Sequence, residues 1–354
     1  MQWTTSGHFA AHSETAQAAP WTAWYMAEGS TSGFNLYYLI QNATGSTATV
    51  QVTYMLPAGA PVVLNYSVPA NSRYTIDVNT QPGLGSTDVA SIVGSTNGVP
   101  IIVERAMYRT SNGVLFNAGH GSAAVPAPAL SWFFAEGATG SFFDEFITLA
   151  NPSPNYTATL TVNYLLSTGS IVTKAYSVAP RQRRTLYVDS EDPALANASL
   201  SAVVNVTNGI PIVAERTMWW PGPAVTADYW YESHNVTGTT ATGRVWLAAD
   251  GEQGGSDSRS TYVLVANPNA FPVSLTATVL PENGGALVSR GYTVPANARL
   301  NIDCGADFTL SGERFSLLVD AGVNQIVVER SMYWTPPGAG AWAAGTANLA
   351  TRLN

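Results

Sequence analysis

The segment Trp24-Tyr-Met-Ala-Glu-Gly29 decides the fold, because it recurs twice further along the chain. The later copies are Trp132-Phe-Phe-Ala-Glu-Gly137 and Trp246-Leu-Ala-Ala-Asp-Gly251. The tryptophans lie 108 and 114 residues apart. Self-similarity at a nearly fixed period is typical of chains built from repeated structural units. The spacing therefore predicts three consecutive units of similar length.

Three further landmarks recur in the same order within each unit. An asparagine follows a short apolar run, and an arginine follows a turn that contains proline in every unit. A Glu-Arg-x-Met-aromatic segment comes last. The copies of these landmarks are Asn42, Asn151 and Asn267; Arg73, Arg183 and Arg299; and Val103–Tyr108, Ala214–Trp219 and Val328–Tyr333.

Each unit has the hydrophobic pattern of antiparallel strands. Ala48, Val50, Val52 and Tyr54 alternate with polar residues, and Asn-Gly turns such as Asn97-Gly98 separate such runs. A period of two predicts strands with one buried face. About seven strand-like runs per unit and no sustained helical period favour a β-sandwich over a propeller blade, which has about four strands. We expect an all-β fold of three tandem immunoglobulin-like antiparallel β-sandwich domains in an elongated array.

The landmarks also set the expected domain boundaries. The N-terminal residues resemble a connector between units, and the residues after Tyr333 supply a C-terminal strand to the last unit. The predicted segments are 1–20 (connector-like), 21–128 (first repeat), 129–240 (second repeat) and 241–354 (third repeat with the C-terminal strand).

The four landmarks together resemble the immunoglobulin-like tandem modules of large secreted bacterial surface proteins. The resemblance extends from about Trp21 to Trp334 and departs mildly at Ala43 (no proline) and Asp250 (for glutamate). It implies a stalk, adhesive or envelope role outside the cytoplasm. Its motifs identify a type of repeat and no biochemical activity.

Composition and charge exclude several classes of protein. The 354 residues carry 15 basic and 23 acidic side chains, a net charge of −8, which argues against a nucleic-acid partner. No apolar run reaches the roughly 18 residues of a membrane span, so no membrane insertion is expected. Cys304 is the only cysteine, which excludes an intrachain disulfide and a cysteine-ligated zinc site. The N-terminus lacks signal-peptide features, so we expect a piece of an exported protein at the cell surface or outside the cell.

Twelve recurring charged residues are the first candidate site. A paired Glu28 and Glu104 could act as the two carboxylates of a glycosidase. Balanced charge in each unit instead favours a structural ion network inside each sandwich, because a buried ion is tolerated only with a partner. Glu104 and Arg105 point to opposite faces of a strand, so we expect Glu28 to pair with an arginine. The network residues are Glu28, Arg73, Glu104, Arg105, Glu136, Arg183, Glu215, Arg216, Asp250, Arg299, Glu329 and Arg330.

Three histidines and one acidic loop are candidate metal ligands. His12, His120 and His234 each precede a unit's tryptophan by twelve residues, so we expect them a domain apart in connecting segments. Metal sites need clustered ligands, so no metal and no cofactor is predicted. The loop Asp250–Asp257 lacks EF-hand spacing, and calcium between domains stays an open alternative. No activated serine is apparent, and the chain is not expected to be an enzyme.

Aromatic residues after the second unit are the best candidate for ligand binding. Exposed tryptophan and tyrosine faces can stack on sugar rings or anchor a protein. Such residues can equally cap the sandwich and fill the joint between domains. The candidate platform consists of Trp219, Trp220, Tyr229, Trp230 and Tyr231.

The functional hypothesis is a non-catalytic extracellular structural protein, such as a stalk, spacer or envelope or surface-layer component. Its partners would be other copies, neighbouring domains of a larger chain or cell-surface polysaccharide. One alternative is a carbohydrate- or protein-binding adhesive module. Another is a self-assembling filament subunit that donates residues 1–20 as an exchanged strand, which would form a heterologous contact that does not close.

Overall fold

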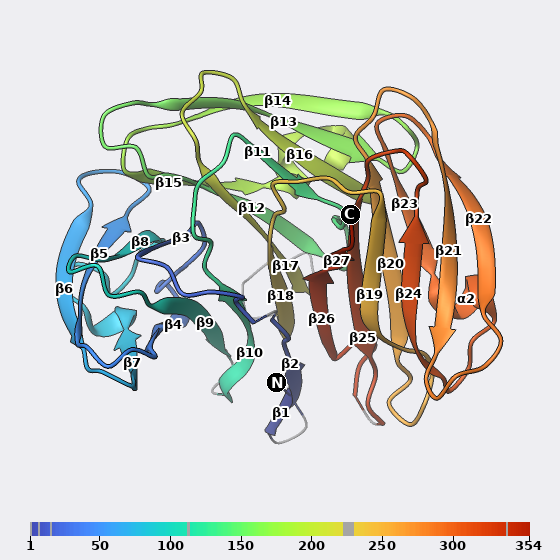
Figure 1. Cartoon of the computed structure of the whole chain (residues 1–354), viewed down its shortest axis with the longest axis horizontal. Helices are drawn as coiled ribbons and strands as arrows, with labels where there is room; N and C mark the ends of the chain where they lie inside the picture. The colour runs from blue at the N-terminus through green and yellow to red at the C-terminus, as the bar shows by residue number, and fades with distance from the viewer. Residues whose placement is uncertain (1, 6–7, 15, 112–113, 222–229, 338) are drawn as a thin grey trace.

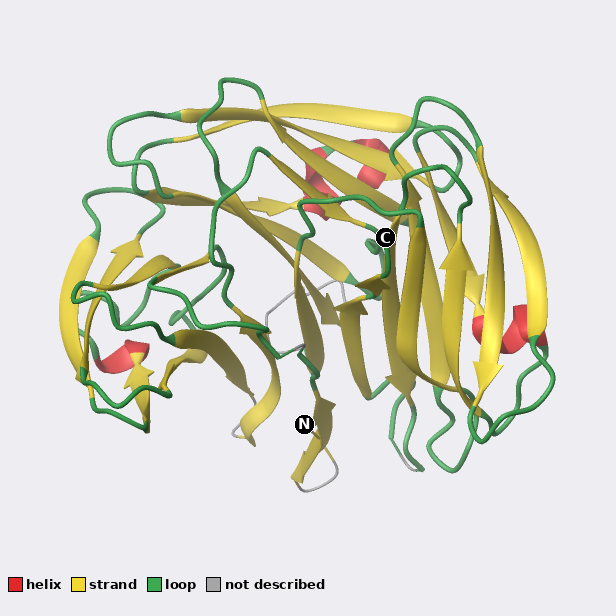
Figure 2. Ribbon diagram, viewed as in Figure 1, coloured by secondary structure: helices red, strands yellow, loops and turns green. Residues whose placement is uncertain are grey.

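The protein is all-β and antiparallel. The structure is a computed structural model that describes residues 2–5, 8–14, 16–111, 114–221, 230–337 and 339–354. Strands make up 57 % of it and helices 5 %, and every strand pairing between the described elements is antiparallel (Figure 2). The all-β class predicted from the period-two pattern is confirmed.

The first sheet pair spans residues 23–123. One sheet has the order β3 (Ala23–Met26), β8 (Ala90–Ser95), β5 (Ala48–Met55) and β6 (Val62–Val68). The other has the order β7 (Ser72–Asp77), β4 (Phe34–Asn42), β9 (Ile102–Ser111) and β10 (Val114–Ala123). Strand β10 lies between the Glu-Arg-x-Met-aromatic landmark of the first predicted repeat and the end of that repeat at residue 128.

The second sheet pair has the same strand order as the first, and the third has this order with one additional edge strand, β27. The second consists of β11 (Ser131–Phe134), β16 (Leu200–Val206), β13 (Ala158–Leu166) and β14 (Ile171–Val178), with β15 (Gln182–Tyr187), β12 (Asp144–Asn151), β17 (Val213–Trp220) and β18 (Glu232–Thr237). The third consists of β27 (Thr351–Arg352), β19 (Val245–Glu252), β24 (Arg314–Asp320), β21 (Val273–Pro281) and β22 (Val288–Val294), with β23 (Ala298–Asp303), β20 (Ser260–Asn267), β25 (Val327–Trp334) and β26 (Ala344–Leu349).

The remaining elements are short. Strands β1 (Gln2–Thr5) and β2 (His8–Ala11) form a hairpin. The helices are η1 (Val78–Thr80), α1 (Val188–Glu191), η2 (Pro193–Leu195) and α2 (Cys304–Phe308). None of the described helices has the length and apolar character needed to cross a membrane.

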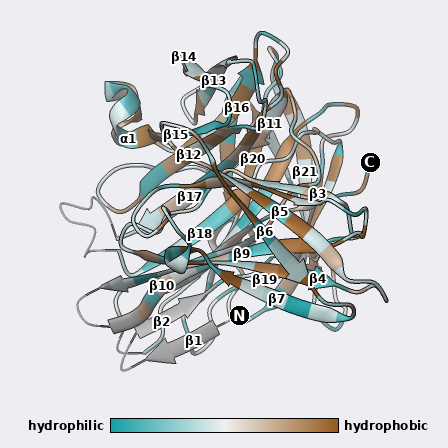
Figure 3. Cartoon of the chain, turned by 90° about the vertical axis from the view of Figure 1, so that its left-hand side faces the viewer, coloured by the Kyte–Doolittle hydropathy of each residue, from teal (hydrophilic) through white to brown (hydrophobic). Residues whose placement is uncertain are grey.

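A hydrophobic core lies between the two sheets of each pair, and the cores of the first two pairs include residues of the neighbouring pair. In the first pair, Val50 and Val52 of β5 pack in one cluster with Leu36 and Tyr38 of β4. The intervening residues of β5 are exposed or half-buried, and Figure 3 shows strands that carry both hydrophobic and hydrophilic segments. Burying each large apolar side chain contributes about 1.5–3 kcal/mol, so the alternating pattern is what holds the two sheets together.

Two of the recurring landmarks stabilise this arrangement through buried hydrogen bonds. The indole Nε1 of Trp24 donates to the carbonyl of Ile101 at 2.7 Å, and that of Trp132 donates to Ile212 at 2.9 Å. The Asn42 side chain donates to the carbonyl of Val68 at 3.1 Å, and Asn151 and Asn267 donate in the same way to Val178 and Val294. A buried polar group needs such a partner, which accounts for the recurrence of these residue types.

The sheet pairs do not form a rod. Figure 1 shows them as an arch, with the first pair at the left, the second at the top and the third at the right. At its centre, β10 contacts β18, β18 contacts β26, and β2 contacts both β10 and β26. The expectation of an elongated array is wrong, because the last strand of each pair packs against the last strand of the next.

Candidate functional site

The first charge network joins the first and second sheet pairs. Arg105 of β9 donates from Nη2 to Glu28 Oε2 at 2.8 Å and from Nη1 to the Glu28 carbonyl at 2.7 Å. Glu215 of β17, from the second pair, lies with Oε2 2.9 Å from Arg105 Nη1. Its Oε1 accepts the backbone N–H of Ala27 at 2.7 Å and that of Glu28 at 3.3 Å. One carboxylate of the second pair therefore holds both the arginine and the strand end of the first.

The second charge network repeats this geometry between the second and third pairs. Arg216 donates to Glu136 Oε2 at 2.9 Å and to Glu329 Oε2 at 2.7 Å. Glu329 of β25 also accepts the backbone N–H of Ala135 at 2.9 Å. The predicted pairing of glutamate with arginine is present. The expectation that each network lies inside one sandwich is wrong, because the neighbouring sheet pair contributes one of the two glutamates.

A second arginine clamps each Ala-Glu-Gly segment. Arg183 Nη1 donates to the carbonyl of Gly29 at 2.6 Å, and Arg299 Nη1 donates to the carbonyl of Gly137. A Cβ on Gly29 would lie 2.8 Å from the Val89 carbonyl oxygen, which is too close for any other residue. The glycine is thus required because the strand end packs closely against Val89 of its own sheet pair.

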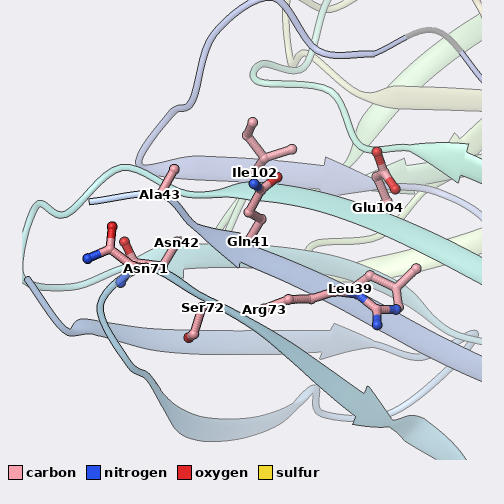
Figure 4. A pocket seen from close by; sticks show the side chains of 9 residues that line it. All are labelled: Leu39, Gln41, Asn42, Ala43, Asn71, Ser72, Arg73, Ile102 and Glu104. Carbon is pink, nitrogen blue, oxygen red and sulfur yellow. The ribbon is translucent and has the colours of Figure 1, made fainter. Parts of the chain in front are cut away.

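Equivalent residues at the two outer ends of the arch are exposed. Arg73 and Glu104 of the first pair line a groove of about 550 Å³ together with Leu39, Gln41 and Ile102 (Figure 4). Within the described part of the chain, neither Arg73 nor Glu104 forms an ion pair or a side-chain hydrogen bond. At the other end, Asp250 is exposed and lies 3.6 Å from Arg330 Nη1. The twelve predicted residues therefore form two complete networks and two open ends.

Burial and neighbouring charge act in opposite directions on the buried carboxylates. Burial raises the pKa of Glu28 above its usual range, and the positive charge of Arg105 partly offsets that effect. Burial raises the pKa of Glu329 as well, and Arg216 opposes it. Burial also opposes ionisation of Glu136, but the positive charges of His234 and Arg216 outweigh it and lower the pKa of that carboxyl.

Glu145 lies near the second network with both carboxylate oxygens buried and without a hydrogen-bond partner, and sequence reasoning missed it. It is fully buried in β12, beside Gly137, and burial raises its pKa well above the usual range. It occupies a position at which the other sheet pairs have Leu36 and Thr261, as the strand registers show. No recurrence marks it, so comparison within the chain could not find it.

The predicted linker histidines meet at the centre of the arch. His120 lies in β10 and His234 in β18, and the expectation that they lie a domain apart is wrong because these strands are in contact. Burial lowers the pKa of His120 well below its usual range, and the charges of Arg105, His12 and His234 add to this effect. Burial also lowers the pKa of His12 and of His234 to about 4. No group of three or more described His, Cys, Asp or Glu residues could hold a metal ion.

The aromatic candidates are mostly packed inside the protein. Trp219 and Trp220 are buried, with 3 % and 1 % of their surface exposed, so neither offers a face for stacking on a ligand. Trp230 stacks on Trp219 at 5.2 Å between ring centroids and donates to Asp144 Oδ2 at 2.6 Å. Tyr231 is 40 % exposed. Tyr229 lies outside the described residues.

Two lesser candidates are occupied by structural contacts. In the loop Asp250–Asp257, Arg259 pairs with Glu252 at 2.7 Å and with Asp257 at 3.2 Å, so an arginine holds the acidic side chains that were weighed for calcium. Cys304 is buried at the start of α2, and burial raises the pKa of its thiol. A buried, protonated thiol is a poor crosslinking site.

Comparison with known proteins gives no family. No family model matches the chain, and no curated protein matches it. Among solved structures, Thermotoga maritima 1070 is 12 % identical over 32 % of this chain and 97 % of that chain, with a TM-score of 0.28. The Anabaena sensory rhodopsin transducer is 27 % identical over 25 % of this chain and 91 % of that chain, with a TM-score of 0.22. A tetra-tandem repeat from the extending region of a large adhesion protein is 14 % identical over 87 % and 68 % of the two chains, with a TM-score of 0.13.

Proposed function

We propose that this chain is a non-catalytic structural protein, built from three immunoglobulin-like sandwich units, that serves as a rigid spacer or envelope component at the cell surface or outside the cell. The observation that carries the proposal is the use of the recurring charged residues. At both joints of the arch they are buried and join neighbouring sheet pairs.

The geometry of the carboxylates supports a structural role over glycoside hydrolysis. Glu28 is buried and accepts hydrogen bonds from Arg105, Thr217 and Asn235. Glu104 is exposed on a different surface of the same sheet pair. A glycosidase needs both carboxyl groups to face one sugar in an open cleft. A carboxylate surrounded by donors cannot approach a substrate.

The joints also support rigidity. Each joint combines a buried glutamate–arginine pair, backbone hydrogen bonds and an arginine clamp, and removing one partner of a buried pair costs about 3–5 kcal/mol. Domains joined only by a linker would move freely, whereas these contacts fix their relative orientation. The arch therefore suits a part that sets a distance or an angle between its attachments.

Small-angle X-ray scattering combined with light scattering tests the proposal. We expect a monomer whose scattering curve matches the one calculated from the arch. The curve should stay the same as the temperature rises, until the protein unfolds. Glu215→Ala should loosen the first joint, and Glu104→Ala is the matched control at an open position. An ensemble of freely rotating units in the unaltered chain would refute the rigid-spacer role. Filaments that vanish when residues 1–20 are deleted would favour the strand-exchange alternative.

A carbohydrate- or protein-binding role is the second candidate. It rests on a small cavity of about 130 Å³ between the first two sheet pairs, lined by Phe34, Phe146, Trp219 and Trp230. Tryptophan fluorescence during titration with a panel of soluble polysaccharides separates the two candidates. Unchanged fluorescence is expected for the structural role, and saturable quenching that is lost in Trp230→Ala would favour the binding role.

A further inference from the structure

The open end of the first sheet pair has the same design as the two surfaces that form the joints. In each pair, the central strand β4, β12 or β20 lies between the strand that carries the glutamate and the strand that carries the clamping arginine. The strand registers align Glu104 with Glu215 and Glu329, and Arg73 with Arg183 and Arg299. The three surfaces thus present the same two charged groups in the same relation.

Two of these surfaces are covered by the same kind of segment. The second pair covers Ala27–Gly29 of the first, and the third pair covers Ala135–Gly137 of the second. The surface of the first pair has no such cover among the described residues, and Figure 4 shows Arg73 and Glu104 at its groove. His12 and Glu14 border this face beside Arg73 and Glu104, and no Ala-Glu-Gly strand end covers it among the described residues.

The centre of the arch shows where a cover would sit. Strands β10, β18 and β26 are the last strands of the three sheet pairs, and β2 takes a fourth place in contact with β10 and β26. His12 precedes Trp24 by the same twelve residues that separate His120 from Trp132, so residues 1–12 correspond to the β10 segment. Ser13 Oγ also lies 2.6 Å from Thr346 Oγ1 beside β26. Among the described residues, β2 pairs with β1 and holds this fourth place beside β10 and β26.

We propose that the Arg73–Glu104 face of the first sheet pair is a docking surface for one further β-sandwich unit that presents an Ala-Glu-Gly strand end. The two occupied joints define the contacts. Glu104 accepts two backbone N–H groups and pairs with an arginine of the incoming unit, and Arg73 donates to the glycine carbonyl. This assignment goes beyond the spacer role and does not depend on it.

A second copy of this chain does not fit the same site. Its first and second Ala-Glu-Gly segments are already covered, and its third is Ala249-Asp-Gly251, in a β19 whose register shifts between Ala248 and Gly251. If that segment docked with the geometry of the joints, the copy's second sheet pair would occupy the place of this chain's third. The incoming unit must therefore have both of its own joint surfaces free.

The composition of the groove indicates a contact that forms and dissociates. Gln41 of the first pair takes the position of Ala150 and Ala266, which lie under the covered surfaces. A glutamine hydrates well while the face is open, whereas buried interfaces between domains favour small apolar residues at such positions. Ala106 replaces Thr217, which removes one donor to the incoming glutamate.

A tethered unit tests the docking surface directly. A copy of residues 21–108 is fused before Met1, which reproduces the twelve-residue spacing between Tyr108 and His120. Carbodiimide labelling of the original Glu104 then reports on cover. We expect labelling to fall at least tenfold in the fused chain, and to return when the added copy carries Ala27→Pro, because proline removes the N–H that the carboxylate accepts. Labelling that stays unchanged while the added copy is folded, as judged by a protected Trp24 indole N–H, overturns the proposal.

A peptide gives a second arm that does not depend on folding of the added copy. The acetylated and amidated peptide of residues 23–31 is titrated into the full chain, and NMR shifts of the Arg73 and Glu104 amides are followed. We expect saturable shifts that weaken at least tenfold with Glu104→Gln, with Arg73→Ala or with the Ala27→Pro peptide. If the added copy is unfolded and the two peptides bind equally or not at all up to millimolar concentration, the docking surface is refuted.

Discussion

Glu215→Ala is the substitution that best tests whether buried charge holds the sheet pairs together. Glu215 is 1 % exposed, accepts two backbone N–H groups and lies 2.9 Å from Arg105. Removing it leaves two buried amides without an acceptor, at about 1–3 kcal/mol each, and breaks half of a buried ion network. Arg105 keeps Glu28, so we expect a loss of about 3–5 kcal/mol in the free energy of unfolding.

Glu104→Ala provides the matched control, because it removes the equivalent carboxylate from an open surface. A surface substitution without partners changes stability by less than about 0.5 kcal/mol. With a urea slope of about 1–3 kcal/mol/M, the Glu215→Ala midpoint should fall by roughly 1–5 M, against little change for the control. Hydrogen exchange at the Ala27 amide should accelerate only in Glu215→Ala. Equal midpoints for the two variants would refute the idea that buried Glu215 stabilises the contact between the first two sheet pairs.

Three further predictions concern pH and the clamping arginines. Because burial lowers the pKa of His234 to about 4, the neutral imidazole contributes fully to stability above about pH 6.5, and this contribution is lost as the pH falls towards 4. The loss amounts to about 3 kcal/mol. His234→Gln should therefore reduce the decrease in unfolding free energy at acid pH, measured by urea titration. Because burial raises the pKa of Glu145, the protonated carboxyl contributes to stability below the unfolded pKa of about 4.3, and this contribution is lost as the pH rises. Glu145→Gln, which stays neutral, should therefore raise the thermal midpoint at pH 8 more than at pH 4. Arg299→Ala should cost about 1.5–3 kcal/mol, and Arg73→Ala close to nothing, in the same denaturation assay; equal losses would contradict the clamp.

The sequence was sufficient for strand identity and for the side of each strand that is buried. Alternation placed Arg105 and Glu104 on opposite faces, and the structure buries the first and exposes the second. Recurrence identified Trp24 and Trp132 as landmarks, and the structure shows that each donates to a carbonyl at the same place in its sheet pair. These features depend on contacts within about 110 residues of chain, where local pattern and repetition both carry information.

The relation between units could not be predicted from the same pattern. An outward-facing glutamate has the same sequence signature whether water or another sheet covers it. Glu215 and Glu104 belong to matching motifs, yet one is buried and the other is exposed. The histidines were misplaced for the same reason, because separation along the chain says nothing about strands that return to a common centre.

Residue differences among the three sheet pairs show which outer faces are covered, which their shared motifs do not. On the two covered faces, the residue paired with the clamping arginine on the central strand is Ala150 or Ala266. The buried aromatic residue on the glutamate strand is Trp219 or Tyr333. On the open face, the residue paired with the arginine is Gln41. A small residue at a covered face lets two backbones approach, and a polar residue at an open face avoids exposing apolar surface. Glu104 and Arg73 are exposed and contribute no buried ion pair to the stability of this chain. Their presence on a face that is otherwise suited to solvent is therefore the strongest argument that the face binds another unit.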